Sequence, residues 1–449
     1  MALTPTLSLL GFTVSIVLLH TTLQERFRNL NRPVADEGLE HPLPHIWGER
    51  PPSVDVVVPT YNEHPDVLAE CLASLARQDY KGPMRFLVVD DGSANLDELL
   101  PVYKSYLERP DWTVLLRRGG PPGKRHAQQA AICGAGPRTM ARLGVTSGTS
   151  WEGSNAEFVM TVDSDTVVAP DGISWILTPF LDDEVAAVTG DVGILNRTTN
   201  RLTKLIADRY ELLFGHERAA QSYFGKVFCC AGPFSAYRRR HLDEIWDDYM
   251  RRRFLRARCT FGDDIQLTNL MLEKGHRSIY QQQAKALTTA PTTLRAYLRQ
   301  QWRWNRSSYR QFRWILRVLF RERRYQAGPY LPFDLAARVA PPLLLVAALA
   351  AIVPSLVTLE TQRLVEDLLA LAGTAVAWLS AVALQTRKVG FTLLYGLMFI
   401  TLLLPVRLWA LCTLRDSQWG TRTSAGGDVN DDERAIDAVR RGLAELVSP

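Results

Sequence analysis

The chain of 449 residues predicts an α/β domain combined with an α-helical transmembrane region. Apolar, β-branched runs alternate with amphipathic stretches between residues 54 and 116, a pattern typical of parallel strands joined by crossover helices. Four nearly uncharged stretches lie outside that region, and about 20 such residues are enough for one helix to cross a bilayer. The formal net charge of +5 and the mean hydropathy of -0.07 average over both parts. The averages alone would therefore suggest an ordinary soluble protein.

The elements of the α/β domain follow from the alternation. Strands are predicted at residues 54–58, 86–89, 113–116, 158–162 and 185–189, with helices at residues 66–77 and 96–107. Polar clusters follow three of these strands, and they contain Tyr61 and Glu63, Asp91, and the pair Asp163 and Asp165. Ligands of an open α/β sheet gather at the carboxyl ends of its strands, so we expect these clusters to form one composite site.

The apolar stretches cover residues 3–23, 339–359, 364–385 and 389–414. Arg26, Arg28 and Arg32 follow the first stretch, which predicts an N-terminal transmembrane helix within residues 1–25, Met1 outside and the catalytic domain in the cytosol. A cleaved signal peptide is the alternative, but it would need a basic segment before the apolar run. We therefore expect a multi-pass plasma membrane protein. Residues 335–414 would form its C-terminal transmembrane or interfacial helices. Both alternatives are kept for the last apolar stretch, because Pro405 and Arg407 would let it bend and lie in the membrane interface instead of crossing the membrane.

Residues 291–326 have a different pattern, in which arginine recurs every three or four positions among aromatic and aliphatic side chains. This pattern predicts amphipathic helices that lie in the interface of an anionic leaflet, with the lipid bilayer as partner. A solvated basic face is the alternative. Nucleic acid is not an expected partner, because the acidic clusters upstream would repel its phosphates.

Carboxylates supply the predicted chemistry. Asp163 and Asp165 form an Asp-x-Asp pair that can bind Mg²⁺ or Mn²⁺ together with a diphosphate, although a solvated turn is the alternative. Asp91 is a candidate for the uracil or ribose contact, or else a turn cap. Asp264 is the candidate general base for an acceptor hydroxyl, while Asp263 or Asp264 would otherwise be only a helix N-cap. A guanidinium at Arg303 suits a diphosphate.

Taken in order, residues 56–63, 89–93, 163–165, 262–264 and 300–304 resemble the motifs of the processive membrane glycosyltransferases of family 2. Residues 190–196, 229–233 and 419–422 are most similar to hyaluronan synthases, and chitin or chitin-oligosaccharide synthases share nearly all of them except the last. The resemblance implies a Rossmann-like GT-A glycosyltransferase domain at residues 50–290 that uses UDP-sugars and a divalent cation, Mg²⁺ or Mn²⁺. It also implies a QxxRW motif within residues 291–326 and a cytosolic tail at residues 415–449 that carries a WGTR gating loop.

The resemblance further implies roles for individual residues. Asp264 would be the base, and Asp163 and Asp165 would hold the metal. Substrate contacts would come from Tyr61, Glu63, Asp91, Lys124, Asp163, Asp191, Cys230, Gly232, Asp263, Gln300, Arg303, Trp304, Trp419 and Arg422. Among these, Trp304 offers a flat surface to a sugar ring, and Cys230 with Gly232 would line the acceptor path.

The function expected from these features is an inverting, processive β-glycosyltransferase. Its first expected product is hyaluronan, polymerised from UDP-GlcNAc and UDP-GlcA and moved outward across the membrane as the growing polysaccharide. The alternative product is chitin or a chitin oligosaccharide made from UDP-GlcNAc alone. Two other classes remain open: a nonenzymatic membrane channel or scaffold, and a membrane-tethered metal phosphodiesterase, which would normally use histidine ligands.

Overall fold

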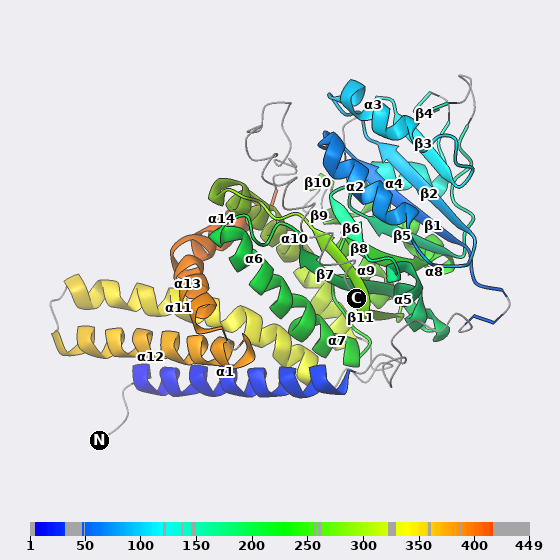
Figure 1. The fold of residues 1–449 in the computed structure, drawn as a ribbon. Coiled ribbons are helices and arrows are strands. Elements are labelled where there is room, and N and C mark those ends of the chain that lie inside the picture. Colours follow the sequence, from blue (N-terminus) through cyan, green and yellow to red (C-terminus); the bar gives the residue numbers. More distant parts are fainter. Residues whose placement is uncertain are drawn as a thin grey trace.

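The computed structural model describes residues 5–31, 47–48, 50–119, 123–136, 138–144, 150–254, 257–258, 262–321, 329–357, 361–386 and 388–415. These residues form a sheet domain with a group of long helices beside it (Figure 1). The strands of the main sheet are β1 (Val54–Thr60), β2 (Met84–Asp90), β3 (Trp112–Arg117), β4 (Met140–Arg142), β5 (Phe158–Val162), β6 (Thr166–Val168), β7 (Val185–Ile194), β8 (Phe234–Arg238) and β11 (Arg277–Thr288). A separate short hairpin pairs β9 (Arg253–Phe254) with β10 (Ala257–Arg258).

The order of the main sheet is β4-β3-β2-β1-β5-β8-β7-β11-β6. The predicted parallel pairing is confirmed for β1, β2, β3 and β5, whereas β8 runs antiparallel between β5 and β7. Thr60 lies opposite Asp90 in the register of β1 and β2. The loops after these two strands therefore leave the sheet side by side.

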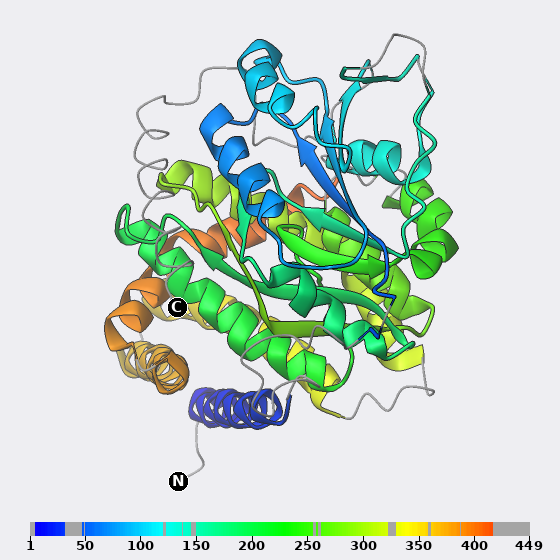
Figure 2. The same ribbon diagram turned by 45° about the vertical axis from the view of Figure 1, so that its right-hand side comes forward.

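Helices cover both faces of the sheet because successive strand residues point to opposite sides. On one face, Val56 and Val58 pack with residues of α2 (Pro65–Ala76), α3 (Leu96–Lys104) and α5 (Gly172–Leu177). On the other, Val57 packs with residues of α4 (Lys124–Cys133), α8 (Arg239–Arg251) and α9 (Asp263–Glu273). Figure 2 shows the blue α2 on one side of the sheet, with the cyan α4 and green α8 on the other.

The described residues of the four apolar stretches are mainly helical. They correspond to α1 (Pro5–Leu30), α11 (Tyr330–Val357), α12 (Thr361–Thr386) and the continuous run of α13 (Val389–Met398), η3 (Phe399–Leu403) and α14 (Leu404–Cys412). Figure 1 shows α1, α11 and α12 side by side, away from β1 to β4. Among the described residues, one helix, Val389–Cys412, is long and apolar enough to cross a membrane. Multiple crossings therefore stay a prediction.

Helix α10 (Leu294–Arg321) connects the two parts, because it packs against both α9 and α14. The predicted single arginine face is wrong in its middle: Arg306 and Arg310 are 0% and 1% exposed. The Arg306 guanidinium lies 3.8 Å from the centre of the Trp302 ring, and Arg310 donates to the Leu414 carbonyl from Nε at 2.9 Å and Nη2 at 2.7 Å. These two arginines bind protein groups, so they are unavailable to a lipid surface.

Two further helical segments, α6 (Arg201–Leu212) and α7 (Ala219–Tyr223), are joined by the π-helical turn η2 (Leu213–Arg218), and η1 (Thr178–Leu181) extends α5. Asn200 starts α6 with a capping box, in which its side chain accepts from the Thr203 amide at 2.9 Å and its own amide donates to Thr203 Oγ1 at 3.0 Å. The capping box therefore stabilises the first turn of α6, the helix that leads into η2.

Candidate active site

The loops after β1 and β2 are fixed to each other. Asn62 adopts a left-handed conformation, with φ of 48°, and its Oδ1 accepts from the Ala94 amide at 2.7 Å. Asp90 accepts from the Ser93 amide at 2.9 Å and from the Tyr103 hydroxyl at 2.8 Å, so its carboxylate is occupied by the turn. These contacts leave the neighbouring Asp91 as the acidic residue of this loop that faces α4.

Glu63 joins the β1 loop to the loop after β5. Its Oε2 accepts from the Ser164 hydroxyl at 2.6 Å, between the two aspartates of the Asp-x-Asp sequence. Tyr61 is half-buried on the same loop as Glu63. The structure therefore brings together the three polar clusters that the sequence placed at strand ends.

Asp91 is buried at the N-terminal end of α4. Its carboxylate accepts from the Arg117 guanidinium and from the Gly123 amide, which immediately precedes the helix. Burial raises the pKa of Asp91 to about 6, although the Gly123 amide and the Arg117 charge oppose this rise. Arg117 was not predicted as a site residue, because a single arginine at the end of an apolar strand has no distinctive spacing in the sequence.

Lys124 lies between two carboxylates. Its Nζ donates to Asp163 and lies 3.4 Å from Oδ2 of Asp263, which also accepts from Gln128 at 3.3 Å. Burial raises the pKa of Asp163 above its ordinary value despite the charge of Lys124. The amine thus holds together the residue that directly follows β5 and the residue that begins α9.

Asp165 has a different environment from Asp163. Its two carboxylate oxygens accept from Thr288 at 3.2 Å and Thr289 at 3.0 Å, at the end of β11. The two predicted metal ligands are therefore near each other but hold different partners.

Asp264 lies in the first turn of α9, where the helix dipole favours negative charge. Gly262 is the N-cap residue and no side chain caps the helix, so the N-cap alternative for Asp263 and Asp264 is wrong. Asp264 accepts from the Ile265 amide at 2.8 Å, and its other oxygen lies 3.5 Å from Cys229 Sγ. Burial and the adjacent charge of Asp263 raise the pKa of Asp264. A raised pKa suits a residue that must accept a proton.

Gly262 is required by its conformation and by the helix beside it. Its φ is +73°, and a Cβ at this position would overlap the Ser307 hydroxyl of α10. Helix α10 therefore lies directly against the start of the helix that carries Asp263 and Asp264.

Arg218 was not singled out in the sequence. It ends the π-helical turn η2, is 7% exposed, and its guanidinium stacks 3.9 Å from the Phe214 ring centre. Its Nη1 has no hydrogen-bond partner among the described residues, and its charge lowers the pKa of Asp264. π-Helical turns are common at functional sites, but the sequence does not reveal where one will form.

Two predicted site residues have other contacts. The side chain of Cys230 is completely buried in the core with Ala187 and Leu267, and Cys229 lies beside Asp264; the place of Cys230 along an acceptor path stays a prediction. Gly232 lies near the carboxylates, because a Cβ added there would be 3.5 Å from Asp163 Oδ2 and 2.6 Å from Lys124 Nζ. Asp191 on β7 binds Lys285 of β11 at 2.6 Å.

The QxxRW residues lie on α10, and Gln300, Arg303 and Trp304 are all half-buried. Burial raises the pKa of Tyr210, the charges of Asp165 and Asp163 raise it further, and the charges of Arg218 and Arg303 lower it.

Trp302 donates from Nε1 to Thr413 Oγ1 at 2.9 Å, which binds α10 to the end of α14 rather than to an interface. Trp419 and Arg422 lie outside the described residues.

The oxygen ligands fit a hard divalent cation. Asp163 retains 31% of its side-chain exposure, and the position beside Gly232, 3.5 Å from Asp163 Oδ2, is held by the Lys124 ammonium group, which is itself a cation paired with this carboxylate. Asp163, Asp263 and Asp264 are close enough to affect one another's pKa values, with Lys124 as the cation in contact with two of them. Carboxylate oxygens with excess negative charge are suitable ligands for Mg²⁺ or Mn²⁺.

Comparison with known proteins gives matches over most of the chain. Residues 51–307 match the family described as "Glycosyltransferase like family 2". An N-acetylglucosaminyltransferase of Mesorhizobium japonicum is 40% identical over 392 residues, which cover 87% of this chain and 86% of that protein. A protein of the same name from Sinorhizobium fredii is 37% identical over 383 residues, which cover 85% of this chain and 86% of that protein.

A solved structure shares the fold. The mannosyltransferase PcManGT from Pyrobaculum calidifontis, in complex with GDP-Man and Mn²⁺, superposes with a TM-score of 0.52 and 19% sequence identity, covering 92% of this chain and 100% of that one. At this identity the likeness shows the fold alone, a GT-A-like α/β architecture.

Replacing Gly232 with alanine should displace Lys124 without unfolding the protein. The added methyl group would lie 2.6 Å from the end of the Lys124 side chain, which can move but then loses contact with the carboxylates of Asp163 and Asp263. We expect a lower melting temperature in a protein that still folds, and weaker binding of nucleotide, measured by thermal unfolding and calorimetry. Gly390→Ala is the control, because no atom lies within 4 Å of its added Cβ. Unchanged nucleotide affinity would contradict a role for the Lys124 position.

Proposed function

This chain belongs to glycosyltransferase family 2, and we propose that it transfers N-acetylglucosamine from UDP-GlcNAc to the end of a growing β-linked chain of the same sugar. The single observation that carries the chemistry is the clustering of Asp163, Lys124, Asp263 and Asp264 at the end of β5 and the start of α9. The sugar is suggested by the relatives named N-acetylglucosaminyltransferase. These relatives favour the chitin-type product over hyaluronan, which was the first expectation from sequence.

Asp264 acts as the general base in the proposed reaction. Its carboxylate takes the proton of the acceptor hydroxyl while that oxygen bonds to C1 of the donor sugar, and the bond from C1 to the diphosphate oxygen breaks. Attack from the face opposite the departing UDP inverts C1. The raised pKa of Asp264 and its place in the first turn of α9 support this role.

The nucleotide and its diphosphate lie, in this proposal, over the loops after β1, β2 and β5. Asp91 contacts the uracil or ribose, with Tyr61 and Glu63 beside it, and Arg303 holds the diphosphate. Asp163 and Asp165 would hold a Mg²⁺ or Mn²⁺, and when bound that ion would offset the charge developing on UDP. Lys124 then remains as a cation beside Asp163 and Asp263.

The acceptor and the tail approach from the α10 side. Trp304 offers a ring surface to the acceptor sugar, and Gln300 precedes it by about one helical turn. The described chain ends at Arg415, four residues before Trp419, and Thr413 and Leu414 are bonded to α10. Trp419 and Arg422 lie beyond the described residues, and we propose that they fold over the nucleotide as a gating loop.

The long helices support export of the product. Helices α1, α11, α12 and the apolar run 389–412 lie on one side of the sheet domain, and α10 connects them to Asp264 through Gly262. We propose that they hold the enzyme in the plasma membrane with the sheet domain in the cytosol, and that the sugar chain leaves between them. The nonenzymatic scaffold and the phosphodiesterase are both disfavoured by the family match and the carboxylate base.

The product test separates the two polymers. We expect membranes containing the protein to make β-linked GlcNAc oligomers from labelled UDP-GlcNAc alone, with no incorporation from labelled UDP-GlcA. Mass spectrometry of the released product provides the measurement. A product that forms only when both donors are present would instead assign hyaluronan synthesis.

Asp264→Asn should remove the base and retain the binding site. The variant keeps the size of the side chain, so we expect unchanged UDP affinity and a fall in kcat of about 10²- to 10⁴-fold. Asp97→Asn, at an exposed position on α3, is the matched control and should keep normal activity. Full turnover in the Asp264 variant would exclude this residue as the base.

Arg218→Met should shift the pH dependence of the reaction. Arg218 lowers the pKa of Asp264, so its removal raises that pKa and protonates the base at a higher pH. We expect the acidic limb of kcat/KM to move toward neutral pH. Arg218→Lys retains the charge and should return the limb toward its original position. If the acidic limb of kcat/KM lay at the wild-type pH in both variants, Arg218 would have no electrostatic effect on the base.

A further inference from the structure

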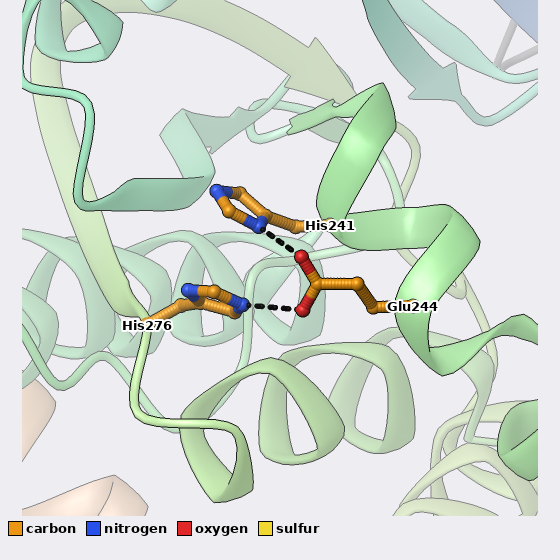
Figure 3. A group of neighbouring side chains, drawn as sticks. All are labelled: His241, Glu244 and His276. Atoms are coloured by element: carbon orange, nitrogen blue, oxygen red, sulfur yellow. Dashed lines mark hydrogen bonds and ion pairs between the residues drawn. The ribbon is translucent and has the colours of Figure 1, made fainter.

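Three side chains that take no part in the proposed reaction meet on the far side of α9. His241 and Glu244 lie one turn apart on α8, and His276 follows the C-terminal end of α9 just before β11 (Figure 3). The 11 residues of α9 span about 16 Å, and the catalytic carboxylates lie at its opposite end. This group is therefore separate from the Asp-x-Asp site.

The ligand atoms of the three side chains converge. Nδ1 of His241 lies 3.1 Å from Oε1 of Glu244, and Nε2 of His276 lies 3.0 Å from Oε2 of the same carboxylate. The two imidazole rings are 3.7 Å apart between centroids, and Figure 3 shows both turned toward Glu244. All three ligand atoms lie within 4.8 Å of one another.

We propose that His241, Glu244 and His276 form a binding site for a transition-metal ion of the Zn²⁺ class, with water in the fourth position. Two imidazole nitrogens and one carboxylate oxygen are a ligand set that Zn²⁺ accepts, whereas Mg²⁺ prefers oxygen alone. Zinc bonds of about 2.0–2.1 Å at tetrahedral angles put ligand atoms about 3.3 Å apart. The observed nitrogen–oxygen spacings, 3.1 Å to Oε1 and 3.0 Å to Oε2 of Glu244, are close to this value, and one ligand atom from each of the three side chains lies within 4.8 Å of the other two.

The backbone holds the ligands in place before any ion binds. His276 donates its amide to the Met271 carbonyl at 3.1 Å, and Gly275, with φ of +95°, donates to Leu272 at 3.1 Å, so the end of α9 is a Schellman motif. The side chains of His241 and His276 are only 8% and 18% exposed, whereas Glu244 is 45% exposed. An ion can therefore enter from the Glu244 side while the two histidines stay fixed.

The protons and charges around the site permit binding. Burial lowers the pKa of His241, which favours the neutral imidazole that metals require. Each histidine can move its proton to the ring nitrogen that does not bind the ion. For His241 that nitrogen now accepts from Arg240 at 3.4 Å, and Arg240, 56% exposed, also contacts Asp183 at 3.3 Å and can turn toward it.

Such an ion would brace the helix that carries the reacting groups. It would tie α8 to the corner between α9 and β11, and that corner fixes the far end of the helix that begins with Asp263 and Asp264. The binding itself does not depend on the sugar specificity, so a failure of the metal test would leave the proposed function untouched.

The test measures metal binding directly. Full-length protein without a histidine tag, purified in detergent with excess Mg²⁺ present, is titrated with Co²⁺ and then with Zn²⁺. We expect one equivalent of Co²⁺ to give the intense visible absorption of a tetrahedral site, and Zn²⁺ to displace it and raise the melting temperature. His276→Gln and Glu244→Gln should each lower the affinity at least about tenfold.

Asp247→Asn is the matched control, since it removes a carboxylate from the next turn of α8, where Asp247 is 81% exposed and pairs with Arg251. It should bind Co²⁺ as the wild type does. A wild-type protein without the tetrahedral band, or a band that survives in both ligand variants, would reduce the group to hydrogen-bonded side chains and overturn the proposal. Using two ligand variants keeps the test valid if one of them fails to fold.

Discussion

The ammonium group of Lys124 between Asp163 and Asp263 is the contact on which the rest of the site depends. Burying several carboxylates in one place is costly unless cations neutralise them. One amine reaches the end of a strand and the start of a helix that are 100 residues apart in sequence. The sheet, α4 and α9 must keep their relative positions for this contact to exist.

Electrostatics then divides the roles of the aspartates. Asp90 is used by its turn, Asp91 by the start of α4 and Asp165 by two threonines, whereas Asp163 and Asp264 are half-buried and burial raises the pKa of each. The residue types are identical, so their chemistry is determined by what surrounds them. Such differences are what the proposed division into a metal ligand, Asp163, and a base, Asp264, requires.

The sequence predicted the strands that alternate with amphipathic helices, because their periodicity is local. Strands β1, β2, β3, β5 and β7 lie within a few residues of their expected positions. The antiparallel β8 was missed, since its place between β5 and β7 depends on contacts with segments about 50 to 80 residues away. The fate of the arginines on α10 was missed for the same reason: a basic helical face has the same pattern whether lipid, water or protein covers it.

The site residues also divide into those predictable from local sequence and those that depend on contacts between distant segments. Carboxylates at strand ends were predictable because the strands themselves were, whereas Arg218 depends on a π-helical turn and Cys230 on which of two adjacent cysteines points inward. The proposed metal-binding group of His241, Glu244 and His276 was also not predicted, because His241 and His276 are separated by β9, β10 and α9 and meet only in the folded chain.

The contact between Gly262 and Ser307 has a mechanical consequence. The Ser307 side chain of α10 packs directly against the backbone of Gly262, so a displacement of α10 would be transmitted to the first turn of α9. Under the proposed function, a force that the growing polymer exerts on the long helices would therefore also displace Asp264, and elongation and export would be mechanically coupled.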